Sequence, residues 1–248
     1  MHLVWYLFLG KSNGWEQIFY RQLAKIAIEV LGETIDHVHV IVRGDIQQRA
    51  SALDSILKLL SDSVVQIIEL PIDEEDKSEY APINYIWELS MKASIQNIMY
   101  IHLKGVSYLE VDLRKYICSL EWGDFLEWAI LERTRLNLKV LTDGKYDVLG
   151  CNFAKYNYRE EERSAFSGNF WIAQARHIHR LEKPKTAKEL INKYGNDKKN
   201  SWRLYYEYWI TSVKGNYINA YKSHSIKDLS FHYYNRISRK HYDITSRI

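Results

Sequence analysis

Cysteine and proline are scarce in this 248-residue chain, with two and three copies respectively. Cys118 and Cys151 are too far apart in the sequence for a zinc-binding spacing, and two cysteines do not build a disulfide framework. The sequence therefore argues against a small disulfide-stabilised scaffold, and its composition fits a reducing compartment.

Long apolar runs are also lacking. The run LVWYLFLG at residues 3 to 10 is too short to span a bilayer. It has no basic segment before it and no small-residue cleavage site after it, so we do not interpret it as a signal peptide. We expect it to form the first core strand of a cytoplasmic protein.

The chain has no large excess of charge of either sign. Its 34 basic and 31 acidic residues give a formal net charge of +3 and are spread along the sequence. This balance gives no field that attracts polyanions, so we predict that nucleic acid is not a partner. The patterns GxGxxG and GxxxxGK[ST] do not follow the first apolar run, so neither a Rossmann dinucleotide site nor a P-loop is supported.

Apolar runs rich in β-branched residues alternate with segments of helical periodicity in the first half of the chain. We predict strands at 3–10, 37–45, 63–70 and 97–103, separated by helices at 15–31, 49–60 and 82–94. This alternation predicts an α/β fold with a mainly parallel, doubly wound sheet and helices on both faces. The hydrophobic content of 46% is enough for a sizeable core.

Beyond residue 110 the alternation is less regular. We predict a long amphipathic helix at 121–141, a strand at 146–153, a strand that continues into a helix at 166–181, and a helix at 201–211. The acidic segment DEEDKSE at 73–79 has no apolar periodicity, so we interpret it as a solvated loop rather than a metal site.

The fourth predicted strand ends in His102, Lys104 and Gly105, and ligands of parallel sheets bind beyond such carboxyl ends. Residues two apart on a strand point the same way. An imidazole beside an ammonium group suits a phosphate better than a metal ion, and Gly105 would allow backbone amides to approach it. The alternative is a histidine hydrogen bonded into the core and a lysine that reaches the surface from the strand end.

The segment FSGNFW places hydroxyl and amide groups beside a bare backbone and two aromatic rings. Sugar recognition needs hydrogen bonds to hydroxyl groups and an apolar face for stacking. Ser167, Gly168, Asn169 and Trp171 are therefore candidates for sugar contact. A glycine bulge in an edge strand would explain the same residues.

Glu207 lies among tyrosine and tryptophan residues in RLYYEYWI. Desolvation there would raise the pKa of its carboxyl group toward that of a useful general base. Pairing with Arg203, one helical turn earlier, is the alternative.

Two His-x-His pairs occur in the sequence. His37 and His39 would share one strand face, whereas His177 and His179 would diverge on a helix, so we do not expect a zinc site.

Five stretches together resemble a family of glycosyltransferases with a GT-A-like fold from bacteria, algae and large viruses. They cover most of residues 3 to 211, in the family's order: PINYIWELS, NIMYIHLKGVS, YDVLGCNF, FSGNFWIAQARHIHRL and YYEYWI. A His-x-Lys-Gly-Val-Ser turn followed by Ser-Gly-Asn-Phe-Trp is more specific than either part alone.

The resemblance implies transfer of a sugar from a nucleotide-sugar donor to a carbohydrate acceptor, in surface polysaccharide or glycan biosynthesis. It implies a nucleotide-binding set and a sugar-binding set, respectively Leu9, Gly10, Arg43, Asp45, Asn84, Lys104 and Gly105, and Ser167, Gly168, Asn169 and Trp171. Glu207, Lys104 and His102 would be catalytic. Glu207 would be the base if the reaction inverts the anomeric centre and would position a substrate if it retains it.

Enzymes of the GT-A class usually hold a divalent cation against the donor diphosphate with an Asp-x-Asp motif, where this chain has His102-Leu103-Lys104. By this resemblance Lys104 would supply charge that the metal ion otherwise supplies. We expect transfer that is metal-independent or weakly metal-dependent, with no required cofactor and no metal-ligating residues. Leu103, where the family more often has threonine, keeps open a non-catalytic carbohydrate- or nucleotide-binding module.

The resemblance implies one domain over residues 1–222, with a nucleotide-binding half at 1–109 and an acceptor-binding half at 110–222. A tail follows at 223–248, in which His224, His232 and His241 are candidates to close over a diphosphate. Its basic residues would also suit contact with an anionic membrane surface. Its interleaved basic and aromatic residues are the one feature that favours nucleic acid.

Overall fold

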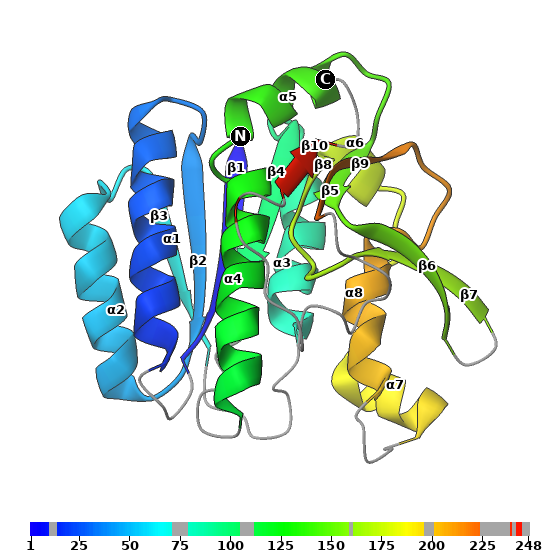
Figure 1. The fold of residues 1–248 in the computed structure, drawn as a ribbon, viewed down its shortest axis with the longest axis horizontal. Helices are drawn as coiled ribbons and strands as arrows, with labels where there is room; N and C mark the ends of the chain where they lie inside the picture. The colour runs from blue at the N-terminus through cyan, green and yellow to red at the C-terminus, as the bar shows by residue number, and fades with distance from the viewer. Residues whose placement is uncertain are drawn as a thin grey trace.

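The computed structural model describes residues 1–9, 14–70, 79–104, 112–158, 161–195, 201–223, 239 and 242–244. Strands and helices alternate through the first half of these residues, and shorter elements follow (Figure 1). In chain order the elements are β1 His2–Phe8, α1 Gly14–Leu31, β2 His37–Arg43, α2 Ile46–Leu59, β3 Val65–Glu69, α3 Tyr80–Ser90, β4 Asn97–His102, α4 Leu113–Ile130, α5 Thr134–Thr142, β5 Val148–Cys151, β6 Phe153–Tyr158, β7 Glu161–Phe166, β8 Trp171–Gln174, α6 Ala175–Ile178, α7 Ala187–Tyr194, the 3₁₀ helix η2 Ser201–Leu204, α8 Tyr205–Trp209, β9 Tyr217–Ser223 and β10 Tyr242–Ile244.

Eight strands of the described residues form one sheet, in the order β10-β9-β5-β8-β4-β1-β2-β3. Strands β3, β2, β1 and β4 are mutually parallel, β8 is antiparallel to both β4 and β5, and β9 is parallel to β5. Strand β10 pairs antiparallel with β9. The prediction of a mostly parallel α/β sheet is confirmed. Strands β6 and β7 form a separate hairpin that projects from this sheet (Figure 1).

The two faces of the sheet carry separate apolar cores, because successive side chains of a strand point to opposite sides. In β1, Leu3, Trp5 and Leu7 pack into the core that includes α1, α2 and α4. Val4 and Tyr6 pack into the core that includes α3, α6, α7 and α8. Helices therefore cover both faces, and the first apolar run of the sequence is a central strand, as predicted.

The long helix predicted at 121–141 is in fact two helices, α4 and α5. The side chain of Thr134 hydrogen bonds to the carbonyls of Ile130 and Leu131, and that of Asn137 donates to the carbonyl of Ala129 at 2.8 Å. These polar groups satisfy the last carbonyls of α4, so the chain can turn there without losing backbone hydrogen bonds. No helix in the described ranges is both long enough and apolar enough to cross a membrane.

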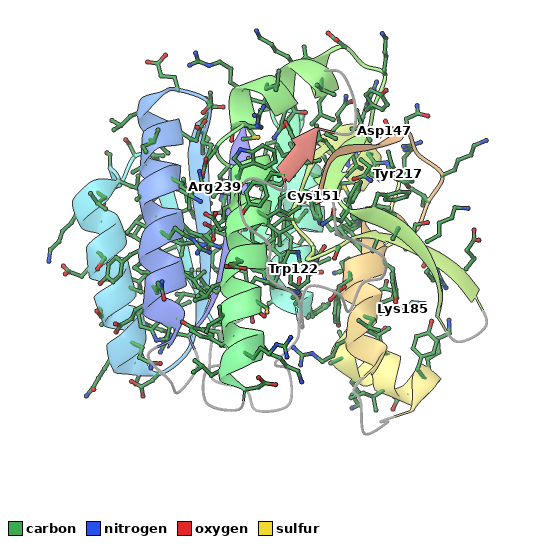
Figure 2. The ribbon with its side chains drawn as sticks, viewed as in Figure 1. Trp122, Asp147, Cys151, Lys185, Tyr217 and Arg239 are labelled. Carbon is green, nitrogen blue, oxygen red and sulfur yellow. The ribbon has the colours of Figure 1, made fainter. Side chains whose placement is uncertain are left out.

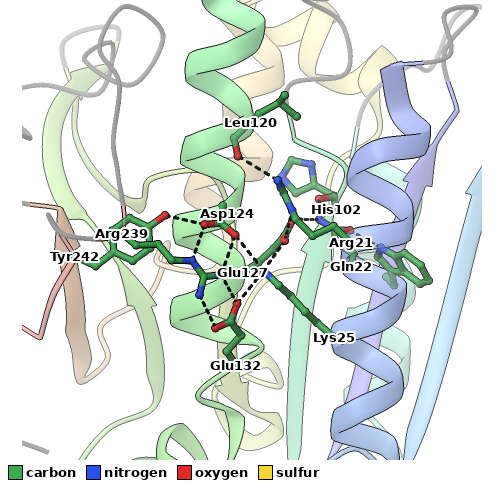
Figure 3. A network of polar contacts seen from close by, with 11 residues as sticks. Arg21, Gln22, Lys25, His102, Leu120, Asp124, Glu127, Glu132, Arg239 and Tyr242 are labelled. Carbon is green, nitrogen blue, oxygen red and sulfur yellow. Dashed lines mark hydrogen bonds and ion pairs between the residues drawn. The ribbon is translucent and has the colours of Figure 1, made fainter.

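Part of the chain beyond residue 222 returns to the body of the protein. Arg239, labelled in Figure 2, donates to Asp124 at 3.1 Å and to Glu132 at 2.8 Å, and the Tyr242 hydroxyl donates to Asp124 at 3.1 Å (Figure 3). Burial would raise the pKa of Asp124, but Arg239 and Lys25 outweigh that effect and lower it to about 2. Three predicted tail residues lie outside the described ones: His224, His232 and His241.

A buried carboxylate holds α1 against α4. Glu127 is fully buried and accepts hydrogen bonds from Arg21 at 2.7 and 2.8 Å, from Lys25 at 3.0 Å and from Gln22 at 3.1 Å (Figure 3). Gln22 also donates to the carbonyl oxygen of His102 at 3.1 Å. The contact between the two helices is therefore tied directly to the end of β4.

Glu127→Ala should lower the free energy of unfolding by about 3 kcal/mol, because it leaves two partly buried cations without their shared carboxylate. Urea denaturation at pH 7 measures this loss. Asp54→Ala is the control, since it removes an exposed ion pair with Lys58 and should cost less than about 0.5 kcal/mol. Similar losses in both variants would contradict the role of Glu127.

Three histidines gather on one face of the sheet at the start of β1 and β2. The rings of His2 and His37 lie 4.7 Å apart, and Nδ1 of His2 contacts Nε2 of His39 at 2.8 Å. The shared face predicted for His37 and His39 is confirmed. His177 is buried and His179 exposed, as their predicted divergence requires. Burial and the neighbouring histidines lower the pKa of both His2 and His39 to about 4.

The protein should lose stability as the pH falls from 6.5 to about 4. In that range the unfolded chain binds protons at His2 and His39 whereas the folded chain does not, which favours unfolding by on the order of 4 kcal/mol, with the half-buried His2 contributing the smaller part. Urea denaturation at several pH values checks this. His39→Gln should flatten the dependence, whereas His179→Gln, at an exposed position, should keep the wild-type slope.

Candidate functional site

His102 ends β4 and is only 8% exposed. Its Nε2 donates to the carbonyl oxygen of Gly168 at 2.9 Å, and its ring lies between those of Tyr100 and Phe170. Burial lowers the pKa of His102, and the charge of Lys104 adds to that effect. The alternative of a histidine hydrogen bonded into the core is therefore the one that the structure supports.

Lys104 follows the strand and is partly exposed. Its Nζ lies 4.6 Å from the centre of the Trp122 ring in α4, which is a cation–π contact. The expectation that it points with His102 relied on strand alternation, and that alternation ends with β4. Both side chains are nevertheless linked to Gly168. His102 hydrogen bonds to its carbonyl, and Lys104 lies over the Trp122 ring, which a Cβ at Gly168 would approach to 3.1 Å.

The segment Ser167–Gly168–Asn169 forms a tight turn between β7 and β8. Gly168 has φ +87° and Asn169 has φ +55°, both in the left-handed region. A Cβ at Gly168 would lie 2.5 Å from Cδ1 of Leu126 in α4, so the turn packs directly against that helix. The alternative of a glycine bulge in an edge strand is wrong, because Gly168 lies in a turn between two strands and not within one.

The side chains predicted to contact sugar are directed into the protein. Ser167, Asn169 and Trp171 are each no more than 2% exposed. The indole Nε1 of Trp171 donates to Oδ1 of Asn169 at 2.9 Å, and Nδ2 of Asn169 donates to Glu79 at 2.6 Å. Trp171 therefore has no open ring face for a sugar, and its indole orients Asn169 instead.

Glu79 forms a hydrogen-bonded cluster with Tyr100, Asn169 and Trp171, although the sequence suggested that it ends a solvated loop. It occupies the N-cap position of α3, and its Oε2 accepts hydrogen bonds from Asn169 and from the Tyr100 hydroxyl, at 2.6 and 2.9 Å. The sequence carries a weak signal for its position, since Pro82 follows at the start of the helix. It carries none for these partners, which lie 90 and 21 residues away.

Glu207 in α8 is partly buried near the same cluster. Burial raises the pKa of its carboxyl group, and the charge of Glu79 raises it further. Lys104 and Arg203 lower it, and Lys104 has the larger effect of the two. The direction of the pKa shift is the one expected from burial, and Arg203 is not the cation that acts on Glu207 most.

Arg43 and Leu9 lie at the carboxyl ends of β2 and β1. Arg43 is 6% exposed, and its Nε and Nη1 have no hydrogen-bond partner among the residues that the structure describes. Leu9 is buried and donates its backbone N–H to the carbonyl of Arg43 at 2.8 Å. Buried N–H groups without an acceptor are costly, so a ligand that accepts hydrogen bonds from Nε and Nη1 would be favoured there.

The other predicted nucleotide-binding residues have separate surroundings. Asp45 is exposed and caps α2 by accepting from the backbone N–H of Gln47 at 2.8 Å. Asn84 in α3 donates to Glu88 at 2.9 Å. Gly10 and Gly105 lie outside the described residues.

The described residues contain no group of three or more histidine, cysteine, aspartate or glutamate side chains arranged to hold a metal ion. Both cysteines are buried, and burial raises the pKa of the Cys151 thiol. A surface pocket of about 550 Å³ lies elsewhere, and its lining shares no residue with the cluster: Ile28, Glu29, Gly32, Thr34, Trp128, Glu132, Arg133, Arg135, Leu136 and Lys139.

Fold and site together define an α/β protein with a polar cluster near the carboxyl ends of its parallel strands. Comparisons of the chain with protein-family models and with curated proteins find no match. The activity must therefore be argued from the geometry of the site.

Gly168→Ala should lower the free energy of unfolding by about 2–4 kcal/mol, because the methyl group would collide with Leu126 and the left-handed backbone disfavours alanine. Gly144→Ala is a matched control, with φ +73° and no atom within 4 Å of its Cβ. It should cost only about 1 kcal/mol, from backbone strain alone. Equal losses in urea denaturation would show that packing against α4 contributes nothing.

Proposed function

We propose that the chain is a nucleotide-sugar-dependent glycosyltransferase of GT-A-like architecture that acts on a carbohydrate acceptor, in surface polysaccharide or glycan biosynthesis. The observation that carries this proposal is that Lys104, which follows β4, and Glu79 both act electrostatically on Glu207. These residues come from three separate elements. A fixed cation beside two carboxylates suits a reaction in which a diphosphate leaves and a hydroxyl group attacks.

Lys104 is assigned to the donor diphosphate. The Trp122 ring contacts its ammonium group through a cation–π interaction, which orients that group. A fixed positive charge there stabilises the negative charge that develops on the leaving group. Transfer would then need no divalent cation, or only weak assistance from one.

Glu207 is assigned to the acceptor. Its raised pKa makes the carboxylate a stronger base toward an acceptor hydroxyl, as an inverting reaction requires. In a retaining reaction it would position a substrate. His102 is a positioning residue, since its Nε2 holds the Gly168 carbonyl. Arg43 is assigned to the nucleoside, because its Nε and Nη1 find no acceptor in the described part of the chain and favour a ligand with hydrogen-bond acceptors.

A non-catalytic carbohydrate- or nucleotide-binding module is the second candidate. The observation that favours it is the burial of Ser167, Asn169 and Trp171, which removes three of the expected sugar contacts. Such a module would bind ligand without turning over a donor.

Purified protein should hydrolyse or transfer from one nucleotide sugar of a panel, with the rate retained in the presence of a chelator. Lys104→Ala should lower that rate about 100-fold, as loss of one transition-state electrostatic contact does elsewhere. Lys155→Ala is the control, because Lys155 is exposed and pairs with Glu162 in the β6–β7 hairpin.

Three outcomes would count against parts of the proposal. Binding of a nucleotide without turnover of any donor would favour the module. Activity that is lost with the chelator and restored by manganese would contradict metal independence. Absence of both turnover and any thermal shift with nucleotides would reject the donor site itself.

A further inference from the structure

We propose that Glu79 is a positioning carboxylate of the site, which fixes the Ser167–Gly168–Asn169 turn through Asn169 and acts on Glu207 through its negative charge. The inference rests on the proposed function for its catalytic meaning, but its two physical parts can be measured without a donor. No motif of the sequence pointed to this residue.

Glu79 does not cap its own helix, α3, with its side chain. It stands at the N-cap of α3, where a short polar side chain usually accepts a hydrogen bond from the first turn. The Glu79 side chain makes no such bond. It reaches instead to residues of β4 and of the turn before β8.

Oε2 of Glu79 accepts two hydrogen bonds. It accepts from Nδ2 of Asn169 at 2.6 Å and from the hydroxyl of Tyr100 at 2.9 Å, and both donors belong to buried side chains. Trp171 fixes the other end of the Asn169 amide. Removing the carboxylate would leave an amide and a hydroxyl group without an acceptor, in a turn that already has left-handed backbone.

The Ser167–Gly168–Asn169 turn connects Glu79 to His102 and Lys104. Gly168, next to Asn169, accepts the hydrogen bond of His102 and packs against α4 beside Trp122. The Trp122 ring in turn makes the cation–π contact with Lys104. A change at Glu79 is therefore transmitted through covalent and hydrogen-bonded neighbours to the place assigned to the diphosphate.

The negative charge of Glu79 also acts on Glu207. The charged groups that act on Glu207 are Lys104 from the end of β4, Glu79 from α3 and Arg203 from η2. Tyr80 and Tyr206, the neighbours of the two glutamates, have ring centres 6.5 Å apart, so α3 and α8 meet at these residues. A like charge there favours the protonated form of Glu207 and makes its carboxylate a stronger base.

Glu79→Gln separates the two roles, because glutamine keeps an acceptor oxygen for Asn169 and Tyr100 but loses the charge. Glu79→Ala loses both. Glu88→Gln is the matched control. Glu88 lies on the same helix and is exposed, and among the described residues its side chain hydrogen bonds only to Asn84. The measurements are urea denaturation and titration of the Glu207 carboxyl carbon by NMR, assigned with Glu207→Gln.

We expect Glu79→Gln to retain most of the stability and to lower the pKa of Glu207, and Glu79→Ala to be clearly less stable than Glu88→Gln. In any donor assay, Glu79→Gln should move the acid limb of the kcat/KM profile to lower pH. An unchanged Glu207 titration in Glu79→Gln, or a Glu79→Ala variant as stable as the control, would overturn the inference. Because neither measurement needs a donor, a protein that turns over no nucleotide sugar would refute the transferase and still decide the role of Glu79.

Discussion

The buried carboxylate of Glu127 is the contact on which the candidate site depends most. It binds Arg21 and Lys25 and so holds α1 against α4 across one face of the sheet (Figure 3). Helix α4 supplies the ring that orients Lys104 and the surface against which Gly168 packs. A shift of α4 would therefore move the cation and the turn together, and burial of Glu127 among opposite charges makes such a shift costly.

A second polar network approaches β4 from the turn before β8. Glu79, Tyr100, Asn169 and Trp171 share their hydrogen bonds, and every one of these side chains except Glu79 is almost fully buried. The end of β4 is thus fixed twice, through the His102 carbonyl by Gln22 and through the His102 ring by Gly168. Buried networks of this kind hold a backbone in one arrangement, as a preorganised site requires.

The charged groups near the end of β4 determine which chemistry the site can support. His102 is buried with a lowered pKa, so a positive charge near the end of β4 comes from Lys104 rather than from the imidazole. The carboxylate of Glu207 interacts electrostatically with the ammonium group of Lys104 and the carboxylate of Glu79. Burial raises the proton affinity of Glu207 most, and the charges of Lys104 and Glu79 then act on it in opposite directions.

Local periodicity by itself determined β1 to β4, the helices between them and the two faces of the sheet, because strand and helix patterns need only neighbouring residues. It also brought His102, Lys104 and Glu207 forward as candidates. Only the tertiary structure decided the antiparallel direction of β8, the burial of His102 and Trp171, and the place of Glu79. Each of these depends on partners far away in the chain, such as the 66 residues between His102 and Gly168, and no local pattern specifies such pairings.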